Sequence, residues 1–351
     1  MIDVYSDVIQ FQGSHYDFGY MQGERLREGV LINNRKKQWF SRPTHRFHID
    51  VETFRRVMEQ FSPSIYEEII GLQEALELPL EKAIRLFGGY YVEYTRSGCS
   101  IFMTEDYMVR NYDNAPLSYE GRFVLYKPTD SGYATIGPTM QITGRTDGMN
   151  EKGLVMGYNF INTKQSADGF MCNMIGRLIL ENCATVNEAI DLLQEIPHRQ
   201  SFSYPLLDPK GKYVVVEASP RKVVVHENNV CTNHFEKLTK ENRYRMEDSL
   251  RRQQEMSSQQ QYVTDAFSAY KMMNDSTRGV FSTSYGSWSG TLHTALYLPK
   301  ERQVGLALGG DRLPFIFSFD KWLEGEQLQV KRINGKLETD TPFANMISLT
   351  E

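Results

Sequence analysis

The spacing of apolar and polar residues changes about a hundred residues into the chain. The first part predicts a short strand at 4–11. The stretch Gly13 to Gly23 then opens a helix that runs toward Phe40, with Ser14 as its predicted N-cap. Further helices are expected at 50–62, 64–77 and 79–88, with Pro63 and Pro79 as breaks. Residues 1–98 are therefore expected to be mostly helical.

From Cys99 onward the pattern predicts strands separated by turns. The first strands are expected at 99–103, 107–113, 122–127, 132–137, 140–147 and 153–160. Two helices follow at 169–183 and 186–195, and then strands at 212–218, 222–227 and 230–233. A polar helical segment covers about 238–274, and the last strands are expected at 291–298, 303–309 and 313–318. This order favours an α+β fold of stacked sheets covered by helices over an alternating βαβ fold.

A β-hairpin is expected to bring three reactive groups together. The strand that begins at Cys99 is followed by the turn residues 104–106 and by a second strand of similar length. Antiparallel pairing would return Arg110 and Asp113 to the neighbourhood of Cys99. Two registers are open, because a pairing sum of 210 sets Asn111 opposite Cys99 and a slip of one sets Arg110 there. In either register a thiol, a guanidinium and a carboxylate meet.

Composition excludes several classes of partner. The chain has 351 residues, a formal net charge of -5 and a pI near 5.9, so nothing suggests a nucleic-acid partner. Short basic groups such as Arg251-Arg252 are interpreted as solvated helix faces. The N-terminus carries acids where a secretory signal needs basic residues, and no apolar run approaches the roughly 18 residues of a membrane span. We expect a cytoplasmic protein without a membrane partner, built as two domains or as one large domain.

The cysteines and histidines do not predict a metal site. The four cysteines lie too far apart for zinc-binding pairs and are too few for a disulfide framework. Cys172 and Cys183 fall in an apolar helical stretch and are expected in the core. His45 and His48 are close in sequence, but no third ligand follows at a useful spacing. A metal hydrolase is therefore disfavoured, and no cofactor is predicted.

The small number of histidines fits a cysteine that supplies its own base. Only seven histidines are present, and His234 alone lies in a motif that suggests chemistry, whereas His293 has no chemical partner along the sequence. A cysteine released as an N-terminal residue carries an α-amine with a pKa near 8 beside a thiol with a pKa near 8.5. The two groups can share a proton at neutral pH without a histidine. We therefore interpret Cys99 as a nucleophile made by self-cleavage.

Four motifs in order carry a family resemblance. They are Gly98-Cys99-Ser100, Arg110-Asn111-Tyr112-Asp113, residues 148–154 with Tyr158-Asn159-Phe160, and Thr232-Asn233-His234-Phe235. The set resembles the successive motifs of the cysteine N-terminal-nucleophile hydrolases, which include choloylglycine hydrolases and acyl-coenzyme A:6-aminopenicillanic acid acyltransferase. The motif from Gly13 to Gly23, the long helical leader and the Asn-His pair resemble the acyltransferase branch most. Each motif alone is weak, but their order and spacing match from residue 10 to about 310.

The resemblance implies a fold, a maturation step and a reaction. The fold would be a four-layer αββα sandwich with a helical leader. Cleavage between Gly98 and Cys99 would leave residues 1–98 as a small non-covalent subunit and residues 99–351 as one composite catalytic domain. The reaction would be hydrolysis or transfer of an acyl group from a non-peptide amide of the penicillin, bile-salt or N-acyl amino acid type, or from a thioester.

The resemblance also assigns roles to individual residues. Cys99 would be the nucleophile and its new α-amine the base, held by Asp113, while Arg110 would favour the thiolate. Asn233 resembles the oxyanion-hole side chain. Two further assignments are Asn159, at a position where family members carry asparagine or tyrosine, and a second arginine, for which Arg243 matches best and Arg245 is close behind.

Each candidate also has a structural interpretation. A lone cysteine on a half-buried strand is usually a packing residue. Arg110 and Asp113 could form only a structural ion pair, and Asn233 could belong to a turn. Residues 148–153 are expected to form a hairpin turn. The main alternative function is an uncleaved, inert family member that binds a small molecule. The sequence leaves open whether the acyl acceptor is water or an amine, and whether the chain forms a homo-oligomer.

Overall fold

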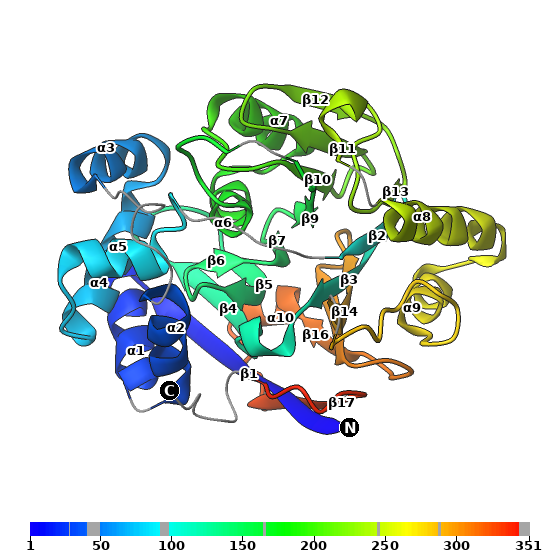
Figure 1. Ribbon diagram of the computed structural model, residues 1–351. Helices are drawn as coiled ribbons and strands as arrows, with labels where there is room; N and C mark the ends of the chain where they lie inside the picture. The colour runs from blue at the N-terminus through cyan, green and yellow to red at the C-terminus, as the bar shows by residue number, and fades with distance from the viewer. Residues whose placement is uncertain are drawn as a thin grey trace.

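The computed structural model describes residues 1–27, 29–40, 50–91, 98–163, 166–243, 246–286 and 289–343. Helices and strands are mixed along the chain, and the strands form two sheets (Figure 1). The expected α+β class is confirmed.

The larger sheet runs through the middle of the molecule. Its strand order is β12 (Val223–His226), β11 (Tyr213–Ala218), β10 (Phe202–Leu207), β8 (Val155–Gly157), β7 (Asp147–Asn150), β5 (Thr135–Met140), β4 (Arg122–Pro128), β1 (Ile2–Gly13) and β17 (Arg332–Leu337). Two short strands, β6 (Gly144–Arg145) and β9 (Asn159–Phe160), pair with β5 and β10. The β1–β4 pair is parallel, whereas β1 and β17 are antiparallel.

The smaller sheet contains the predicted hairpin. Its order is β13 (Val230–Cys231), β2 (Ser100–Met103), β3 (Met108–Asn114), β14 (Gly290–Leu298), β15 (Gln303–Leu308) and β16 (Phe315–Ser318). Both registers predicted for the hairpin are wrong, because Ile101 pairs with Arg110 and Ser100 with Asn111. Met103 pairs with Met108, so the loop has four residues and the pairing shifts by one. As a result the side chain of Arg110 lies on the same sheet face as that of Ile101.

The two sheets pack against each other and carry helices on their outer sides. Side chains of β3 and β14 in the smaller sheet contact Asp147 of β7 in the larger one. Helices α6 (Cys172–Asn182) and α7 (Val186–Glu195) contact the larger sheet, whereas α8 (Glu247–Gln259) and α9 (Ala266–Asn274) contact the smaller one (Figure 1). Helices therefore contact both sheets of the expected α+β fold.

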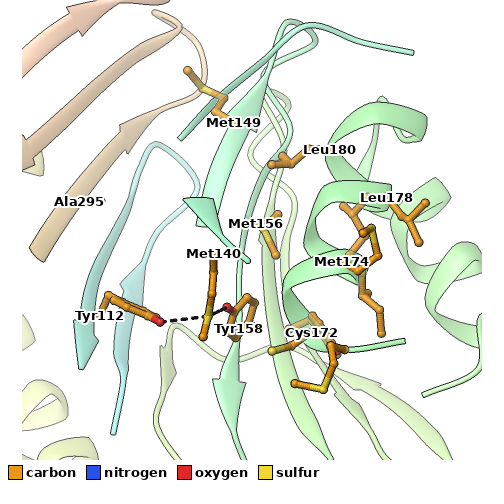
Figure 2. Packing of buried hydrophobic residues seen from close by; sticks show 14 of the residues in the cluster. Tyr112, Met140, Met149, Met156, Tyr158, Cys172, Met174, Leu178, Leu180 and Ala295 are labelled. Carbon is orange, nitrogen blue, oxygen red and sulfur yellow. Dashed lines mark hydrogen bonds between the residues drawn. The ribbon is translucent and has the colours of Figure 1, made fainter. Parts of the chain in front are cut away.

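The core fills the spaces between these layers. Met156 of β8 packs beneath α6, whose residues Cys172, Met174 and Leu178 are fully buried (Figure 2). A β-carbon added to Gly157 would lie 2.7 Å from Ile101 Cδ1, so the two sheets pack closely at this position. Cys172 and Cys183 are buried, as predicted. Within the described ranges no helix is long and apolar enough to cross a lipid bilayer.

The predicted leader helices are present in the first hundred residues. They are α1 (His15–Arg27), α2 (Val30–Phe40), α3 (Val51–Phe61), α4 (Pro63–Ala75) and α5 (Leu80–Phe87), so the single helix expected up to Phe40 is in fact two. Helix α1 packs tightly on α4, since a β-carbon added to Gly19 would lie 2.0 Å from the Glu68 carbonyl oxygen. Gly19 and Gly23 of the Gly13 to Gly23 motif therefore serve close helix packing.

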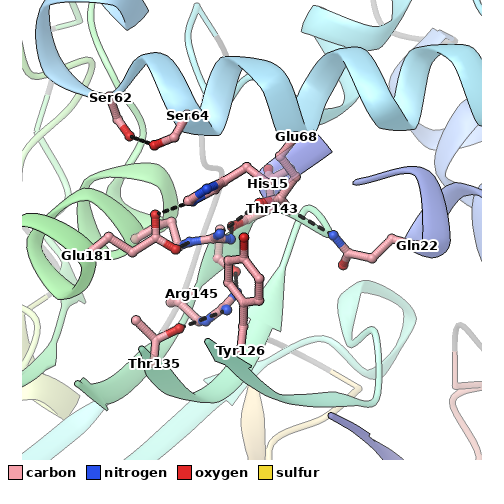
Figure 3. Close-up of polar contacts among 12 residues, drawn as sticks. His15, Gln22, Ser62, Ser64, Glu68, Tyr126, Thr135, Thr143, Arg145 and Glu181 are labelled. Carbon is pink, nitrogen blue, oxygen red and sulfur yellow. Dashed lines mark hydrogen bonds and ion pairs between the residues drawn. The ribbon is translucent and has the colours of Figure 1, made fainter. Parts of the chain in front are cut away.

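The leader is also part of the larger sheet. Strand β1 lies between β4 and β17, and both of those strands follow Cys99 in the chain. A polar network adds to this contact: the buried His15 bonds the buried Glu181 at 3.0 Å (Figure 3) and the exposed Asp130 at 2.7 Å. Arg177 of α6 donates to Glu68 of α4 at 2.7 Å. Strand pairing and buried charges thus join residues 1–91 to the rest of the protein.

Some elements differ from the prediction. Strand β10 was not expected, because it is buried at every position and contains Pro205, so it shows no alternation. Strand β17 was not expected because its Asn334-Gly335 pair is typical of a turn. The helical segment at 238–274 is divided into α8 and α9. Short helices complete the list: η2 (Pro116–Ser118), η3 (Thr239–Glu241), η4 (Gln260–Tyr262) and α10 (Phe319–Leu323).

Candidate active site

The hairpin brings a thiol and a guanidinium together in the interior. Cys99 immediately precedes β2, and its side chain is fully buried. The Arg110 Nη2 group of β3 lies 3.5 Å from Cys99 Sγ. A buried cation at this distance favours the ionised form of a thiol. The contact expected between Cys99 and Arg110 is therefore present, although in a different register.

Arg110 is held on every side. Its Nη1 donates to Asp147 Oδ1 at 2.5 Å, and its Nη2 also donates to the Tyr158 carbonyl oxygen at 2.6 Å. The Tyr112 and Tyr158 rings lie 4.9 and 5.0 Å from the Arg110 Cζ atom, and both tyrosine hydroxyls point to Met140 Sδ (Figure 2). Burial alone would lower the pKa of Arg110, but the Cys99 thiol and the Asp147 carboxylate raise it. The guanidinium stays charged.

Asp113 lies beside the Gly98–Cys99 bond. Its Oδ1 accepts a hydrogen bond from Thr291 Oγ1 at 2.7 Å. A β-carbon placed on Gly98 would lie 3.7 Å from Asp113 Oδ2, which locates the second oxygen next to this peptide. Burial raises the pKa of Asp113 to about 8, against the opposing effect of the Arg252 charge. At neutral pH this carboxyl is largely protonated in the uncleaved chain.

The second arginine of the site comes from α8. Arg252 Nη1 donates to the Cys99 carbonyl oxygen and to Ser100 Oγ, both at 2.7 Å. Its Nη2 donates to Asn233 Oδ1 at 2.9 Å, and its Nε to Asp248 at 2.8 Å. The interpretation of Arg251-Arg252 as a solvated helix face is therefore wrong for Arg252, whose side chain is 3% exposed. Its four-residue spacing from Asp248 resembles an ordinary surface pair, and this concealed it in the sequence.

Arg243 is not brought to Cys99 in the same way. It follows η3, and its backbone N–H donates to the Asn162 carbonyl oxygen at 3.2 Å. Arg245 lies outside the described residues. Among the described arginines that follow Asn233 in sequence, Arg252 is the one with hydrogen bonds to Cys99 and Ser100.

The two predicted asparagines lie near each other on neighbouring segments. Asn233 follows β13, and its Nδ2 donates to the Phe160 carbonyl oxygen at 2.9 Å. Asn159 of β9 is fully buried, and its Nδ2 donates to the Cys231 carbonyl oxygen at 2.9 Å. Asn233 is connected to the Cys99 carbonyl through Arg252, whereas Asn159 bonds the last residue of β13, the strand that precedes Asn233. The two side chains therefore have different surroundings.

Ser289 was not predicted from the sequence. It is buried, and its Oγ would lie 3.0 Å from a β-carbon placed on Gly98. Over the described ranges, this hydroxyl is a buried polar group with no hydrogen-bond partner. No motif distinguishes Ser289 from other serines in the sequence, because only the fold brings the start of β14 next to Gly98.

Two of the described histidines, His293 and His234, bond groups other than the thiol. His293 is fully buried between Asp147, 3.3 Å from its Nε2, and the Tyr119 hydroxyl, 3.0 Å from its Nδ1. It thus has chemical partners that its sequence neighbourhood did not suggest. His234 Nδ1 lies 2.8 Å from Ser249 Oγ. In the described part of the chain, no group of three or more His, Cys, Asp or Glu residues could hold a metal ion.

The two packed sheets place a cysteine just before a strand and an arginine beside its thiol, an arrangement that the resemblance to the cysteine N-terminal-nucleophile hydrolases implies. A sequence model of the family described as acyl-coenzyme A:6-aminopenicillanic acid acyl-transferase matches residues 102–313, which is more than half of the chain. The chain belongs to this family, as its motifs predicted. No curated protein sequence matches it significantly.

Several solved structures are similar at low sequence identity. Penicillin V acylase from Agrobacterium tumefaciens is 16% identical, with 63% of this chain and 84% of that one covered and a TM-score of 0.38. A mutant of conjugated bile acid hydrolase from Clostridium perfringens is 15% identical, with 69% and 97% covered and a TM-score of 0.40. The Caenorhabditis elegans ortholog of N-acylethanolamine-hydrolyzing acid amidase is 12% identical, with 58% and 93% covered and a TM-score of 0.40.

Proposed function

We propose that this protein is a self-processing acyltransferase or amidohydrolase that uses Cys99 as its nucleophile. Its substrate would carry an acyl group in a non-peptide amide, of the penicillin, bile-salt or N-acyl amino acid type, or in a thioester. The observation that carries the proposal is the setting of the Gly98–Cys99 peptide. Asp113 and Ser289 lie beside Gly98, Arg252 holds the Cys99 carbonyl, and Arg110 faces the thiol.

Self-cleavage needs only groups that lie at this peptide. The Cys99 sulfur attacks the Gly98 carbonyl carbon, and the tetrahedral intermediate collapses to a thioester as the Cys99 nitrogen leaves as an amine. Water then hydrolyses the thioester, leaving a carboxylate on Gly98 and a free thiol and α-amine on Cys99. The Ser289 hydroxyl is a donor without another bond in the described structure, and is available to the developing oxyanion. The burial of Cys99 is no obstacle, because the attacked carbonyl is in its own chain.

Cleavage also prepares the base for the second reaction. The α-amine released on Cys99 would lie near Asp113, whose pKa is raised to about 8 chiefly by burial in the uncleaved chain. A protonated amine nearby favours the carboxylate, so Asp113 would ionise and hold the amine in place. The amine would then take the thiol proton as Cys99 attacks the acyl carbonyl of the substrate. Asn233 would donate to the oxyanion, a role typically worth about 10²–10³ in turnover.

The leader is proposed to remain bound as a small subunit after cleavage. Strand β1 pairs on both sides with strands of the catalytic part, and the contacts of His15 and Glu68 bury charges at the boundary. Separating the two parts would expose an interior strand of the larger sheet. We therefore treat residues 1–98 and 99–351 as two chains of one folded unit.

The alternative is an uncleaved, inert member that binds a small molecule, and one observation favours it. Cys99 is fully buried in the uncleaved chain and is not accessible to a substrate. A denaturing gel with mass spectrometry separates the two proposals. Maturation predicts two fragments, of which the larger begins at Cys99; a fully active protein that stays at 40.6 kDa would overturn it. Hydrolysis assays with penicillin V, glycine-conjugated bile acids and N-acyl amino acids would then identify the acyl group.

A further inference from the structure

Asp147 is a buried carboxylate at the junction of the two sheets, and none of the predicted roles includes it. It belongs to none of the four sequence motifs and lies one residue before the stretch 148–154. The side chain is fully buried. Its Oδ1 contacts Arg110 Nη1 at 2.5 Å, Thr146 Oγ1 at 2.6 Å and His293 Nε2 at 3.3 Å, and its Oδ2 accepts from the Tyr297 hydroxyl at 2.6 Å.

These contacts determine which way the Arg110 guanidinium points. Its Nη1 is occupied by Asp147, so Nη2 is the group left to meet the Tyr158 carbonyl and Cys99 Sγ. A planar guanidinium cannot move one nitrogen without the other. Fixing Nη1 from the larger sheet therefore aims Nη2 at a thiol of the smaller sheet.

The same contacts divide the charge of Arg110. Burial would raise the pKa of Asp147, but the charge of Arg110 and the hydrogen bonds to His293 and Thr146 lower it. Asp147 is therefore an anion at neutral pH. The single positive charge of Arg110 is shared between this carboxylate and the Cys99 thiolate, so Arg110 stabilises the thiolate less than an uncompensated cation would.

We propose that Asp147 is a positioning residue for the Cys99 nucleophile, acting through Arg110 to aim one guanidinium nitrogen and to limit how far the thiol is acidified. The inference rests on the proposed role of Cys99. Limiting the acidity has a chemical purpose, since a thiolate of lower pKa is a weaker nucleophile. It would keep the thiol matched to an α-amine base with a pKa near 8.

Other titratable groups interact with Cys99, Arg110, Asp113 or Asp147, and a test must leave them unchanged. They are Tyr112 and Asp113 from β3, Tyr119, Tyr158, Cys172 from α6, Arg252 and Asp248 from α8, and His293 and Tyr297 from β14. A substitution that removes charge from Asp147 alone, without changing its shape, isolates its contribution.

The test is the pH dependence of alkylation of Cys99 by iodoacetamide in the purified protein after self-cleavage, with both fragments present, read by peptide mass spectrometry. In Asp147→Asn the uncompensated Arg110 should shift the midpoint to lower pH by about one unit. Tyr297→Phe removes one hydrogen-bond donor from the Asp147 carboxylate but keeps the charge of that carboxylate. The alkylation midpoint of Cys99 in this variant should move to higher pH, by less than one unit. Tyr270→Phe is the matched control, because this buried tyrosine bonds the Arg312 carbonyl instead and should leave the midpoint unchanged.

The possible outcomes separate this inference from the proposed function. If wild-type protein is not cleaved, or is cleaved but Cys99 is not alkylated at any pH, the proposed role of Cys99 fails. If Cys99 reacts but Asp147→Asn leaves its midpoint unchanged, the role of Asp147 is overturned while the proposed function stands. Should Asp147→Asn fail to fold, Tyr297→Phe decides alone: an upward shift relative to Tyr270→Phe supports the inference, and equal midpoints overturn it.

Discussion

Two buried ionic networks in this protein differ in what their arginines face. Where the leader meets the rest of the protein, Arg177 donates from Nε to Glu181, from Nη1 to the Thr143 carbonyl and from Nη2 to Glu68. Figure 3 labels these three partners. Between the two sheets, Arg110 meets one carboxylate, that of Asp147, and directs its other terminal nitrogen to a carbonyl and to Cys99 Sγ. The first network is closed by two carboxylates, whereas the second includes a thiol.

The difference indicates two separate tasks. The network of Arg177 contains no reactive group. Removing one of its partners would leave a buried charge unpaired, so the network opposes separation of the two parts that it joins. A network that includes a thiol can change its charge when the thiol ionises. Breaking the leader network should therefore lower stability and leave the reactivity of Cys99 unchanged, whereas breaking the site network should change that reactivity.

The largest effect is expected from Cys99→Ala. This variant lacks the thiol that makes the site network reactive, and it should neither cleave nor turn over any acyl substrate. Mass spectrometry of the purified protein and an acylase assay provide the measurements. Cys172→Ala is the control: its thiol belongs to the first residue of α6 and is buried, burial raises its pKa, and the variant should be processed as wild type. Cleavage in Cys99→Ala would assign the nucleophile to another residue.

Glu68→Gln should break the leader network with the next largest effect. Removing this carboxylate leaves Arg177 with one anionic partner in a fully buried position. The loss of one partner of such a pair typically costs about 3–5 kcal/mol in the free energy of unfolding. Urea unfolding gives this value, and the pH midpoint of Cys99 alkylation should not move. Glu74→Gln, on the exposed face of the same helix, is the matched control and should change neither quantity.

Asn233→Ala tests the site network without removing a charge. If Asn233 Nδ2 serves the oxyanion, its loss should lower kcat by about 10²–10³, equivalent to roughly 3–4 kcal/mol of transition-state stabilisation. The free energy of unfolding should change far less than in Glu68→Gln. Asn182→Ala, which removes a comparable amide bonded to the Leu178 carbonyl, serves as the control. Equal kcat values in Asn233→Ala and wild type would exclude the oxyanion role.

Local patterns predicted the elements of this fold better than its site. The leader helices and the Cys99 hairpin follow from short-range spacing, and the hairpin alone was enough to pair Arg110 with the thiol. Its register was missed because the length of the connecting loop depends on how the strand ends pack. Arg252 and Asp147 were missed for another reason. Arg252 has the spacing of a surface ion pair, and Asp147 receives donors from β3 and from β14, about 150 residues away along the chain. Only the assembled sheets bring these partners together.

The smallest expected effect is a pH dependence of the leader network, and His15 carries it. Burial would lower the pKa of His15, but the Glu181 carboxylate raises it above its usual value, while the pKa of Glu181 is lowered chiefly by Arg177 against its burial. A histidine with a raised pKa contributes stability that is complete below its unfolded pKa of about 6.5 and is lost as the pH rises through its folded pKa. The Glu181 carboxylate, whose pKa is lowered, contributes stability that is complete above its unfolded pKa of about 4.3 and is lost as the pH falls through its folded pKa.

The free energy of unfolding should therefore be highest between these limits and should decline on the alkaline side. His15→Gln should flatten that alkaline decline, because a neutral amide cannot lose a proton, and urea unfolding at a series of pH values measures the slope. His198→Gln is the control, since His198 is buried and bonded to the Leu193 carbonyl without a carboxylate partner, and burial lowers its pKa. If the alkaline decline persists in His15→Gln, the pH dependence belongs to another group.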